Sequence, residues 1–285
     1  RPKATSSAIT RKKIEPMAYA TAKELDPALI PVIDIEPLRD GSDPAGVAAA
    51  LHAASQGLGF IYITGHGIPD AAIVAAREAA YGFFHAMPEQ KASVRVSAKH
   101  RGWLGQGGAK MQDDAKADLK ESFIWGYQGG DGETPEDHPL RGPNQWPAFL
   151  PEMQGVAMAY FEHAHGVART LMTGFALGLG LAPDFFLKTA SRPLSRASFV
   201  YYPPQSPDAG DDQFGVGSHT DFGVMTVLCQ DGVGGLQVQT AQGDWIHAPP
   251  IPGTLIVNVA DLLARWTDGA YKSTPHRVVN TSGRE

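Results

Sequence analysis

A histidine and an aspartate lie two positions apart in the stretch GVGSHTDFGVMT, residues 215–226. Val and Thr, frequent around this pair, favour extended structure. If residues 216–229 form a strand, side chains two apart point to the same face, so His219 and Asp221 project together. Two ligand atoms placed in this way can contact one metal ion.

A third ligand has to come from elsewhere in the chain, and His276 is the candidate. It begins the β-type run HRVV, which predicts a neighbouring strand. Two histidines and one carboxylate on one face of an octahedron leave three positions open, the arrangement used for non-haem Fe(II) that activates dioxygen. His219, Asp221 and His276 are therefore candidate iron ligands and catalytic residues. An H-x-D pair alone is a weak signal, and a surface or structural pair is the simpler alternative.

The elements that position these residues are predicted to be short strands. After about residue 195, β-type segments separated by turns follow one another: ASFVYYPP, VMTVLCQ, GLQVQT, DWIHAPP and TLIVNVADLL. Many short strands at near-regular spacing predict a sandwich or a barrel. Apolar residues at helical spacing predict a helix before them, over roughly 149–180.

The N-terminal half has α/β character. Strands are expected within residues 28–35 and 59–68. Between them, Asp43 as N-cap, Pro44 at the first helical position and Gly57 just past the end predict a helix. A second helix is expected from Asp70 to Met87. Residues 90–147 carry the least regular pattern, and the stretches 102–112 and 126–147 are expected to form loops.

Composition excludes several classes of protein. The chain has 285 residues, 43% of them hydrophobic and 19% charged, which is typical of a globular protein. The net charge of −6 gives no reason to expect nucleic acid or an anionic membrane as partner. No apolar run approaches the ~20 residues that a membrane helix needs. The single cysteine, Cys229, excludes an internal disulfide and is expected in the core, so we expect a cytoplasmic location. No pattern indicates an oligomeric state.

Several motifs occur in the order found in one known family. They are IPVIDI, GFIYITGHGIP, DLKESFIWG (118–126), YYPPQ, GSHTDFGVMTVL, GGLQVQ and the run GDWIHAPPIPGTLIVNVADLLARWTDGAYKSTPHRVVN. From about residue 30 the sequence resembles the Fe(II)- and 2-oxoglutarate-dependent oxygenases of the isopenicillin N synthase-like family. The resemblance implies a mainly β fold with flanking α, in which a double-stranded β-helix, or jelly roll, follows an N-terminal α/β region. We expect a disordered extension over 1–27, an N-terminal oxygenase region over 28–148, and a helix plus β-helix domain over 149–285.

The resemblance also implies the site and its reaction. Iron would be held by His219, Asp221 and His276, and Tyr202 would help to hold the carboxylate of 2-oxoglutarate. Phe123, in the DLKESFIWG motif, is a candidate to contact substrate. With Fe(II), 2-oxoglutarate and O₂, such an enzyme oxidises a small molecule by hydroxylation, desaturation or cyclisation and forms succinate and CO₂. The substrate's identity is not encoded in these motifs.

One part of the family pattern is not met. An arginine followed two residues later by a serine is expected shortly after the second histidine, where its planar fork would anchor 2-oxoglutarate. The sequence ends at NTSGRE, and Arg284 comes two positions too early to take this role. A truncated C-terminus is therefore expected, and a chain ending at Glu285 should bind 2-oxoglutarate poorly. Two alternatives stay open: an iron-dependent oxidase of the same fold that does not use 2-oxoglutarate, and a non-catalytic metal- or ligand-binding β-helix protein.

Residues near the candidate ligands have simpler expected roles. Phe222 and Arg277 immediately follow ligands, so alternation points them away from the metal and favours packing roles. Lys120 and Glu121 are expected to form a solvated or structural charge pair. The two histidines of EHAHG, residues 162–166, fall in the expected helix, where side chains two apart do not face each other, so a metal role is not expected there.

Overall fold

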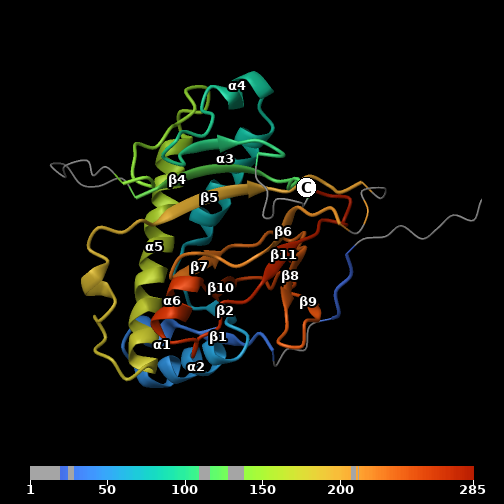
Figure 1. Ribbon diagram of the computed structural model, residues 1–285. Coiled ribbons are helices and arrows are strands. Elements are labelled where there is room, and N and C mark those ends of the chain that lie inside the picture. The colour runs from blue at the N-terminus through green and yellow to red at the C-terminus, as the bar shows by residue number, and fades with distance from the viewer. Residues whose placement is uncertain (1–19, 25–28, 109–115, 128–137, 207–209, 211) are drawn as a thin grey trace, which may run out of the picture.

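The computed structural model describes residues 20–24, 29–108, 116–127, 138–206, 210 and 212–285. Strands form three sheets, and helices flank them on one side and at both ends (Figure 1). Within this part of the chain, no helix has the length and apolar character needed to cross a membrane. The helices are α1 (Glu36–Arg39), α2 (Pro44–Gln56), α3 (Asp70–Phe84), α4 (Pro88–Ala92), α5 (Met153–Gly178) and α6 (Asp261–Trp266), with one 3-10 turn, η1 (Leu187–Thr189).

Two four-stranded sheets form the β-helix. The first has the order β1-β2-β10-β7, in which only β1 and β2 run parallel. The second has the order β6-β11-β8-β9 and is antiparallel throughout. The strands of the first sheet are β1 (Val32–Asp34), β2 (Phe60–Thr64), β10 (Leu255–Val259) and β7 (Met225–Leu228). Those of the second are β6 (Val216–His219), β11 (His276–Val278), β8 (Leu236–Gln239) and β9 (Trp245–His247).

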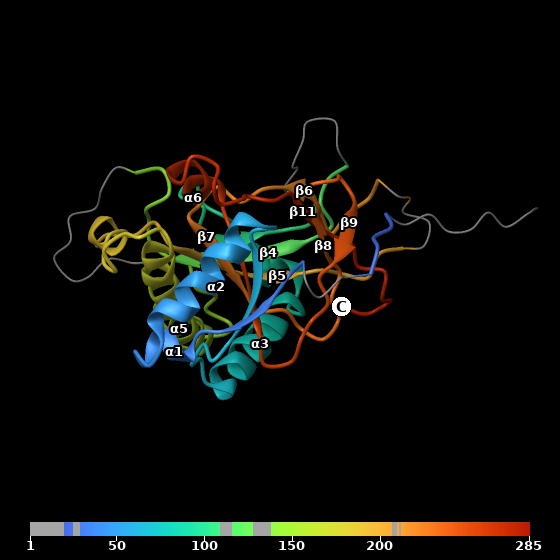
Figure 2. The ribbon, with the colours of Figure 1, turned by 90° about the horizontal axis from the view of Figure 1, so that it is seen from below.

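Alternating side chains of the first sheet enter two different cores. Phe60, Tyr62 and Ile256 point toward the second sheet and pack with residues such as Val238. The intervening residues of the same strands pack against α1, α2 and α5 on the other face. Because both faces are covered, β2 and β10 read as continuous apolar runs rather than as alternating ones. The predicted jelly-roll core is confirmed. Seen from below, α2 and α5 lie at one side of the sheets and β8 and β9 at the other (Figure 2).

A third sheet, with the order β3-β4-β5, leads into the β-helix. Glu121 pairs with Tyr201, and Phe123 pairs with Phe199. The aromatic side chains of one face pack against α3 and α5 in a separate cluster that includes Trp125. The other face carries the alternate residues of both strands. These strands are β3 (Gly102–Leu104), β4 (Glu121–Gly126) and β5 (Arg196–Tyr201).

Most predicted elements are present, and local chemistry explains their ends. Helix α2 begins at Pro44 because the Asp43 carboxylate accepts a hydrogen bond from the Gly46 backbone N–H at 2.9 Å, as the N-cap prediction required. The helix expected to reach Met87 ends at Phe84, and the short α4 follows. Strands β3 and β4 lie in the region whose pattern was least regular, and the loop expected over 102–112 is wrong at its start, because Gly102–Leu104 pair with β4 as β3.

Three expectations differ from the structure. The strand predicted over 216–229 is two strands, β6 and β7, joined by residues 220–224. The end of TLIVNVADLL turns into α6 because the strand hydrogen bonding stops at Val259. The predicted disordered extension is ordered where it is described, since Lys23 bridges β9 and exchanges backbone hydrogen bonds with Trp245 and His247. Residues 1–19 and 25–28, and the central parts of the predicted loops, lie outside the described residues.

Candidate iron site

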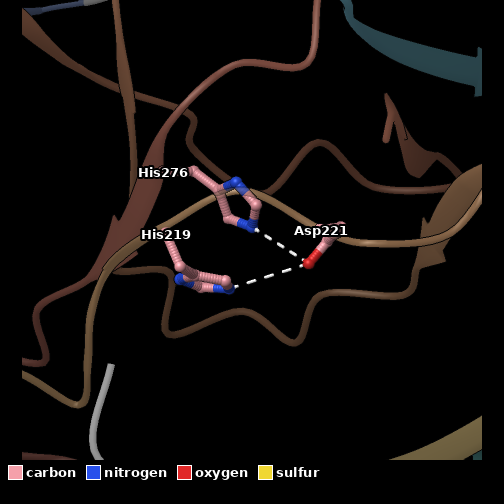
Figure 3. Close-up of side chains that lie close together, drawn as sticks. All are labelled: His219, Asp221 and His276. Atoms are coloured by element: carbon pink, nitrogen blue, oxygen red, sulfur yellow. Dashed lines mark ion pairs between the residues drawn. The ribbon is translucent and has the colours of Figure 1, made fainter. Parts of the chain in front are cut away.

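The three candidate ligands converge at the open end of the second sheet. His219 ends β6 and His276 begins β11, and the two are direct partners in the antiparallel register. Asp221 lies in the turn just after β6. Its Oδ1 atom is 3.7 Å from His219 Nε2 and 3.8 Å from His276 Nε2 (Figure 3). One ligand atom from each residue lies within 4.8 Å of the others, so a single ion can contact all three.

Backbone carbonyls fix how both imidazoles face the centre. His219 Nδ1 lies 2.8 Å from the Gly217 carbonyl oxygen, and His276 Nδ1 lies 3.2 Å from that of Thr274. A carbonyl oxygen can only accept, so each Nδ1 carries the hydrogen and each Nε2 presents its lone pair. This second contact orients a ligating histidine and sets its tautomer.

Asp221 is oriented in the same way through its other oxygen. Oδ2 accepts hydrogen bonds from the Thr226 hydroxyl at 2.5 Å and from the Asn258 side-chain amide at 2.8 Å. Thr226 lies on β7 and Asn258 opposite it on β10, so two strands of the first sheet support this carboxylate. Oδ1 is left to face the two histidines. Four strands of two sheets, β6, β11, β7 and β10, and the turn after β6 therefore build the site together.

Electrostatics keep the ligands in the protonation states that bind a metal. Burial lowers the pKa of His276, and the neighbouring His219 lowers it further, so His276 is neutral at pH 7. Burial alone would raise the pKa of Asp221. The pull of His276 and the hydrogen bonds from Asn258 and Thr226 outweigh it, and the pKa is lowered. The carboxylate is therefore ionised and needs no proton release to bind a cation.

These residues fit a ferrous ion. Two imidazole nitrogens and one carboxylate oxygen are the donors of the facial arrangement that leaves positions open for other ligands. A closed structural site would need a fourth protein ligand. Within the ranges that the structure describes, no further histidine, cysteine or carboxylate joins the group. The arrangement can hold a metal and still bind a chelating molecule and O₂.

Two further predicted site residues lie on opposite faces of the third sheet. Tyr202 follows β5, and its ring packs over Gly215 at the start of β6, where a Cβ would come within 2.8 Å of the ring. Phe123 is fully buried in the aromatic cluster, with its ring 4.7 Å from that of Phe83. Because side chains alternate along β4, Lys120 and Ser122 lie on the face that Tyr202 shares, and Phe123 lies on the opposite face. Phe123 is thus a core residue, because its position in the strand directs it toward α3.

The predictions for the residues next to the ligands, and for Lys120 and Glu121, are only partly met. Arg277 is buried as expected, with its guanidinium carbon 4.0 Å from the centre of the Trp245 ring and its Nε donating to Gln237. The packing role predicted for Phe222 is wrong, because this side chain is 88% exposed. Lys120 and Glu121 do not pair with each other, since adjacent strand residues face opposite sides.

Sequence reasoning missed the residues that hold Asp221. Thr226 and Asn258 each interrupt an otherwise apolar run, VMTVL and TLIVNVA. A polar residue inside a buried strand needs a hydrogen-bond partner, and that signal could have pointed to both. The two histidines of EHAHG, His163 and His165, both lie on α5.

Comparison with known proteins identifies the family. Residues 30–149 match the family described as non-haem dioxygenase in morphine synthesis N-terminal, and residues 195–285 match the 2OG-Fe(II) oxygenase superfamily. A 2-oxoglutarate-Fe(II) type oxidoreductase, ppzC, of Metarhizium rileyi is 34% identical, with 91% of this chain and 75% of the relative covered. Homoarginine-6-hydroxylase of Arabidopsis thaliana is also 34% identical, over 90% of this chain and 74% of the relative.

Solved structures agree with the sequence comparison. A full-length Neurospora crassa protein, crystallised with α-ketoglutarate, is similar with a TM-score of 0.79 and 30% identity, over 90% of this chain and 80% of that one. The chain belongs to the 2-oxoglutarate–Fe(II) oxygenase family. It is a non-haem Fe(II)- and 2-oxoglutarate-dependent dioxygenase acting on a small molecule, and the predicted cofactors are confirmed. The readings as an oxidase without 2-oxoglutarate and as a non-catalytic protein give way to this one.

Proposed function

We propose that His219, Asp221 and His276 hold the catalytic Fe(II) of this enzyme. One observation carries the assignment: three ligand atoms converge while the second polar atom of each side chain is engaged elsewhere. These additional hydrogen bonds hold each side chain with its free ligand atom toward one centre, an orientation that a metal site requires. The cluster is also only partly covered, which leaves a way in for other molecules.

Tyr202 is proposed to bind the cosubstrate. When bound, Fe(II) and 2-oxoglutarate supply the oxidising chemistry that consumes O₂ and releases succinate and CO₂. Burial raises the pKa of Tyr202, and the negative charges of Asp118 and Asp221 raise it further. The phenol therefore stays protonated at any physiological pH and can donate a hydrogen bond to a carboxylate. The Tyr202→Phe change should weaken 2-oxoglutarate binding roughly tenfold to 100-fold.

The reaction we infer is hydroxylation of a C–H bond in a small molecule. The name of one relative, the homoarginine-6-hydroxylase of Arabidopsis thaliana, supports hydroxylation, and validamycin A dioxygenase of Streptomyces hygroscopicus subsp. limoneus is likewise named for a small molecule. We also propose a cytoplasmic enzyme without nucleic-acid or membrane partners. The net charge of −6 supports this, because it repels the anionic surfaces of both.

The test is an anaerobic Fe(II) titration of the full chain, with and without 2-oxoglutarate, that follows the visible charge-transfer band of the iron chelate. Because weak binding of 2-oxoglutarate is expected from the sequence, the titration uses saturating cosubstrate. We then expect the band in the wild type and its loss in His219→Ala. His163→Ala is the matched control, because it removes an exposed histidine from α5 and should leave the band unchanged.

Aerobic turnover completes the test. Succinate should appear in step with O₂ consumption, and His219→Ala should abolish both. Iron binding that survives in His219→Ala, Asp221→Ala and His276→Ala alike would refute the site. A chelate band without succinate under O₂ would refute the reaction and leave only the metal site.

A further inference from the structure

Lys120 and Tyr202 lie side by side at the start of β6. Glu121 is paired with Tyr201, and the same register continued by one step sets Lys120 opposite Tyr202. Cross-strand partners project to the same face of a sheet. The Lys120 backbone N–H donates to the Gly215 carbonyl at 3.2 Å, and the Tyr202 ring covers Gly215. Both residues therefore border the strand that ends at His219.

The Lys120 ammonium is largely buried but poorly satisfied. Its side chain is 18% exposed, and its Nζ lies 3.8 Å from Asp118 Oδ2, which is longer than a hydrogen bond. Asp118 Oδ2 has no hydrogen-bond partner, although Oδ1 accepts from the Gly217 N–H at 3.0 Å. Among the described residues, no acceptor lies within hydrogen-bond distance of Nζ. An ammonium has three donors, and those of Lys120 face space open to solvent or a ligand, since Nζ is not among the fully buried atoms without a partner.

The same ammonium lies within electrostatic range of the iron ligands. Burial lowers the pKa of Lys120, and the carboxylates of Asp118 and Asp221 counter part of this effect. Lys120 in turn lowers the pKa of His276. Geometry places the amine beside the site as well: Asp118 accepts from the Gly217 N–H, and the carbonyl of Gly217 is the one that His219 Nδ1 contacts.

We propose that Lys120 receives a carboxylate group of a ligand at the iron site, an inference that rests on the proposed function. One ammonium and one neutral phenol suit a single negative charge, and Asp118 already offsets part of the cationic charge. A phosphate dianion would need more donors. The carboxylate comes from one of two sources: the distal end of 2-oxoglutarate, or the substrate.

The first arm of the test compares two keto acids on the anaerobic Fe(II) protein. 2-Oxoglutarate and 2-oxovalerate share the chelating head and the chain length, but only the first has a distal carboxylate. If Lys120 binds that carboxylate, Lys120→Met should weaken 2-oxoglutarate at least about tenfold and leave 2-oxovalerate unchanged. Lys188→Met is the matched control, because it removes an exposed lysine paired with Asp184 far along the chain.

The second arm uses protein saturated with 2-oxoglutarate. Homoarginine, benzoate and octanoate are each compared with their primary amides by the shift that they cause in the chelate band. If the substrate supplies the carboxylate, wild type should favour an acid over its amide, and Lys120→Met should lose this preference while binding 2-oxoglutarate normally.

Loss of folding is separated from loss of binding by a second variant. Lys120→Met leaves the buried Asp118 without its counter-charge, whereas Asp118→Asn with Lys120→Met leaves no unpaired charge. Both variants should bind Fe(II) alone as the wild type does. If neither changes 2-oxoglutarate affinity or any acid–amide preference by more than twofold, the proposal is overturned. A wild type without a chelate band even at saturating 2-oxoglutarate would instead overturn the proposed function itself.

Discussion

Two buried lysine–carboxylate pairs lie on opposite faces of β4, and they are built differently. Lys91 Nζ reaches Glu121 Oε2 at 2.8 Å and also donates to the Phe84 carbonyl, and the Trp103 indole donates to the same Oε2 at 2.7 Å. Lys120, next in sequence to Glu121, holds Asp118 only at 3.8 Å. The lysine and the carboxylate of the first pair are hydrogen-bonded to each other and to further protein groups. Those of the second pair are not hydrogen-bonded to each other, and Asp118 Oδ2 has no hydrogen-bond partner.

The difference separates a purely structural pair from one that still has hydrogen-bonding groups to offer a ligand. A buried ion pair is stabilising only when hydrogen bonds satisfy the remaining donors and acceptors. The Lys91–Glu121 pair meets this condition within the aromatic core behind β4. The Lys120–Asp118 pair faces the iron site instead, where a ligand can complete it. The segment that contains β4 thus carries a fully hydrogen-bonded ion pair on its core face and an incompletely hydrogen-bonded pair on its other face.

The largest expected effect is a loss of Fe(II) affinity when an iron ligand is replaced. Replacing His219, Asp221 or His276 by alanine should lower Fe(II) affinity by more than the roughly 100-fold that loss of an outer partner costs. The midpoint of urea unfolding in the absence of metal should change little for His219, which is only partly buried. Calorimetric Fe(II) titration and urea denaturation of the same samples check both statements. A large stability loss with iron binding intact would reverse the assignment of the two faces.

The Lys91→Met change, on the core face of β4, should lower stability rather than Fe(II) affinity. It leaves Glu121 as an uncompensated buried charge, so the free energy of unfolding should fall by about 3–5 kcal/mol. Fe(II) affinity of the folded fraction should stay within twofold of the wild type. Urea unfolding measures the first quantity and metal titration the second. If the loss stays below about 1 kcal/mol, the pair is not the finished structural contact described above.

Removing an outer support of the site should give an intermediate effect. Thr226→Val keeps the shape of the side chain but deletes a hydrogen bond to Asp221, so Fe(II) affinity should fall about 10-fold to 100-fold. That hydrogen bond helps to lower the pKa of Asp221. Without it the pKa rises, and protons compete with iron at higher pH than in the wild type. Fe(II) titrations at several pH values would contradict this if both proteins lost affinity over the same range.

The smallest stability effect is expected at Phe222, which borders the site but belongs to neither face. Its ring is 88% exposed, so Phe222→Ala should change the free energy of unfolding by less than about 0.5 kcal/mol. Phe123→Ala, with the same change in a fully buried position, should cost about 3–5 kcal/mol. Urea denaturation of the two variants compares them directly. Similar losses would mean that Phe222 is covered in solution.

Much of the fold and the iron ligands could be read from the sequence, because their determinants are local. The capping of α2 depends on Asp43 and Gly46, three residues apart. The H-x-D spacing places two ligands close together whether residues 220–224 are strand or turn. Alternation in β-type runs also placed Arg277 in a packed position. It could not show that Phe222 is exposed, because exposure depends on which elements lie over a turn.

The tertiary structure decided everything that depends on which strands are neighbours. The sequence by itself determined the donor types, two imidazoles and a carboxylate, and the family motifs around them. It did not reveal that β7 and β10 bring Thr226 and Asn258 onto Asp221, or that Glu121 pairs with Lys91 rather than Lys120. Nor did it show that Phe123 faces the core while Lys120 faces the site. Hydrogen bonds between distant residues depend on strand register, and register is set by packing of both sheets rather than by any single segment.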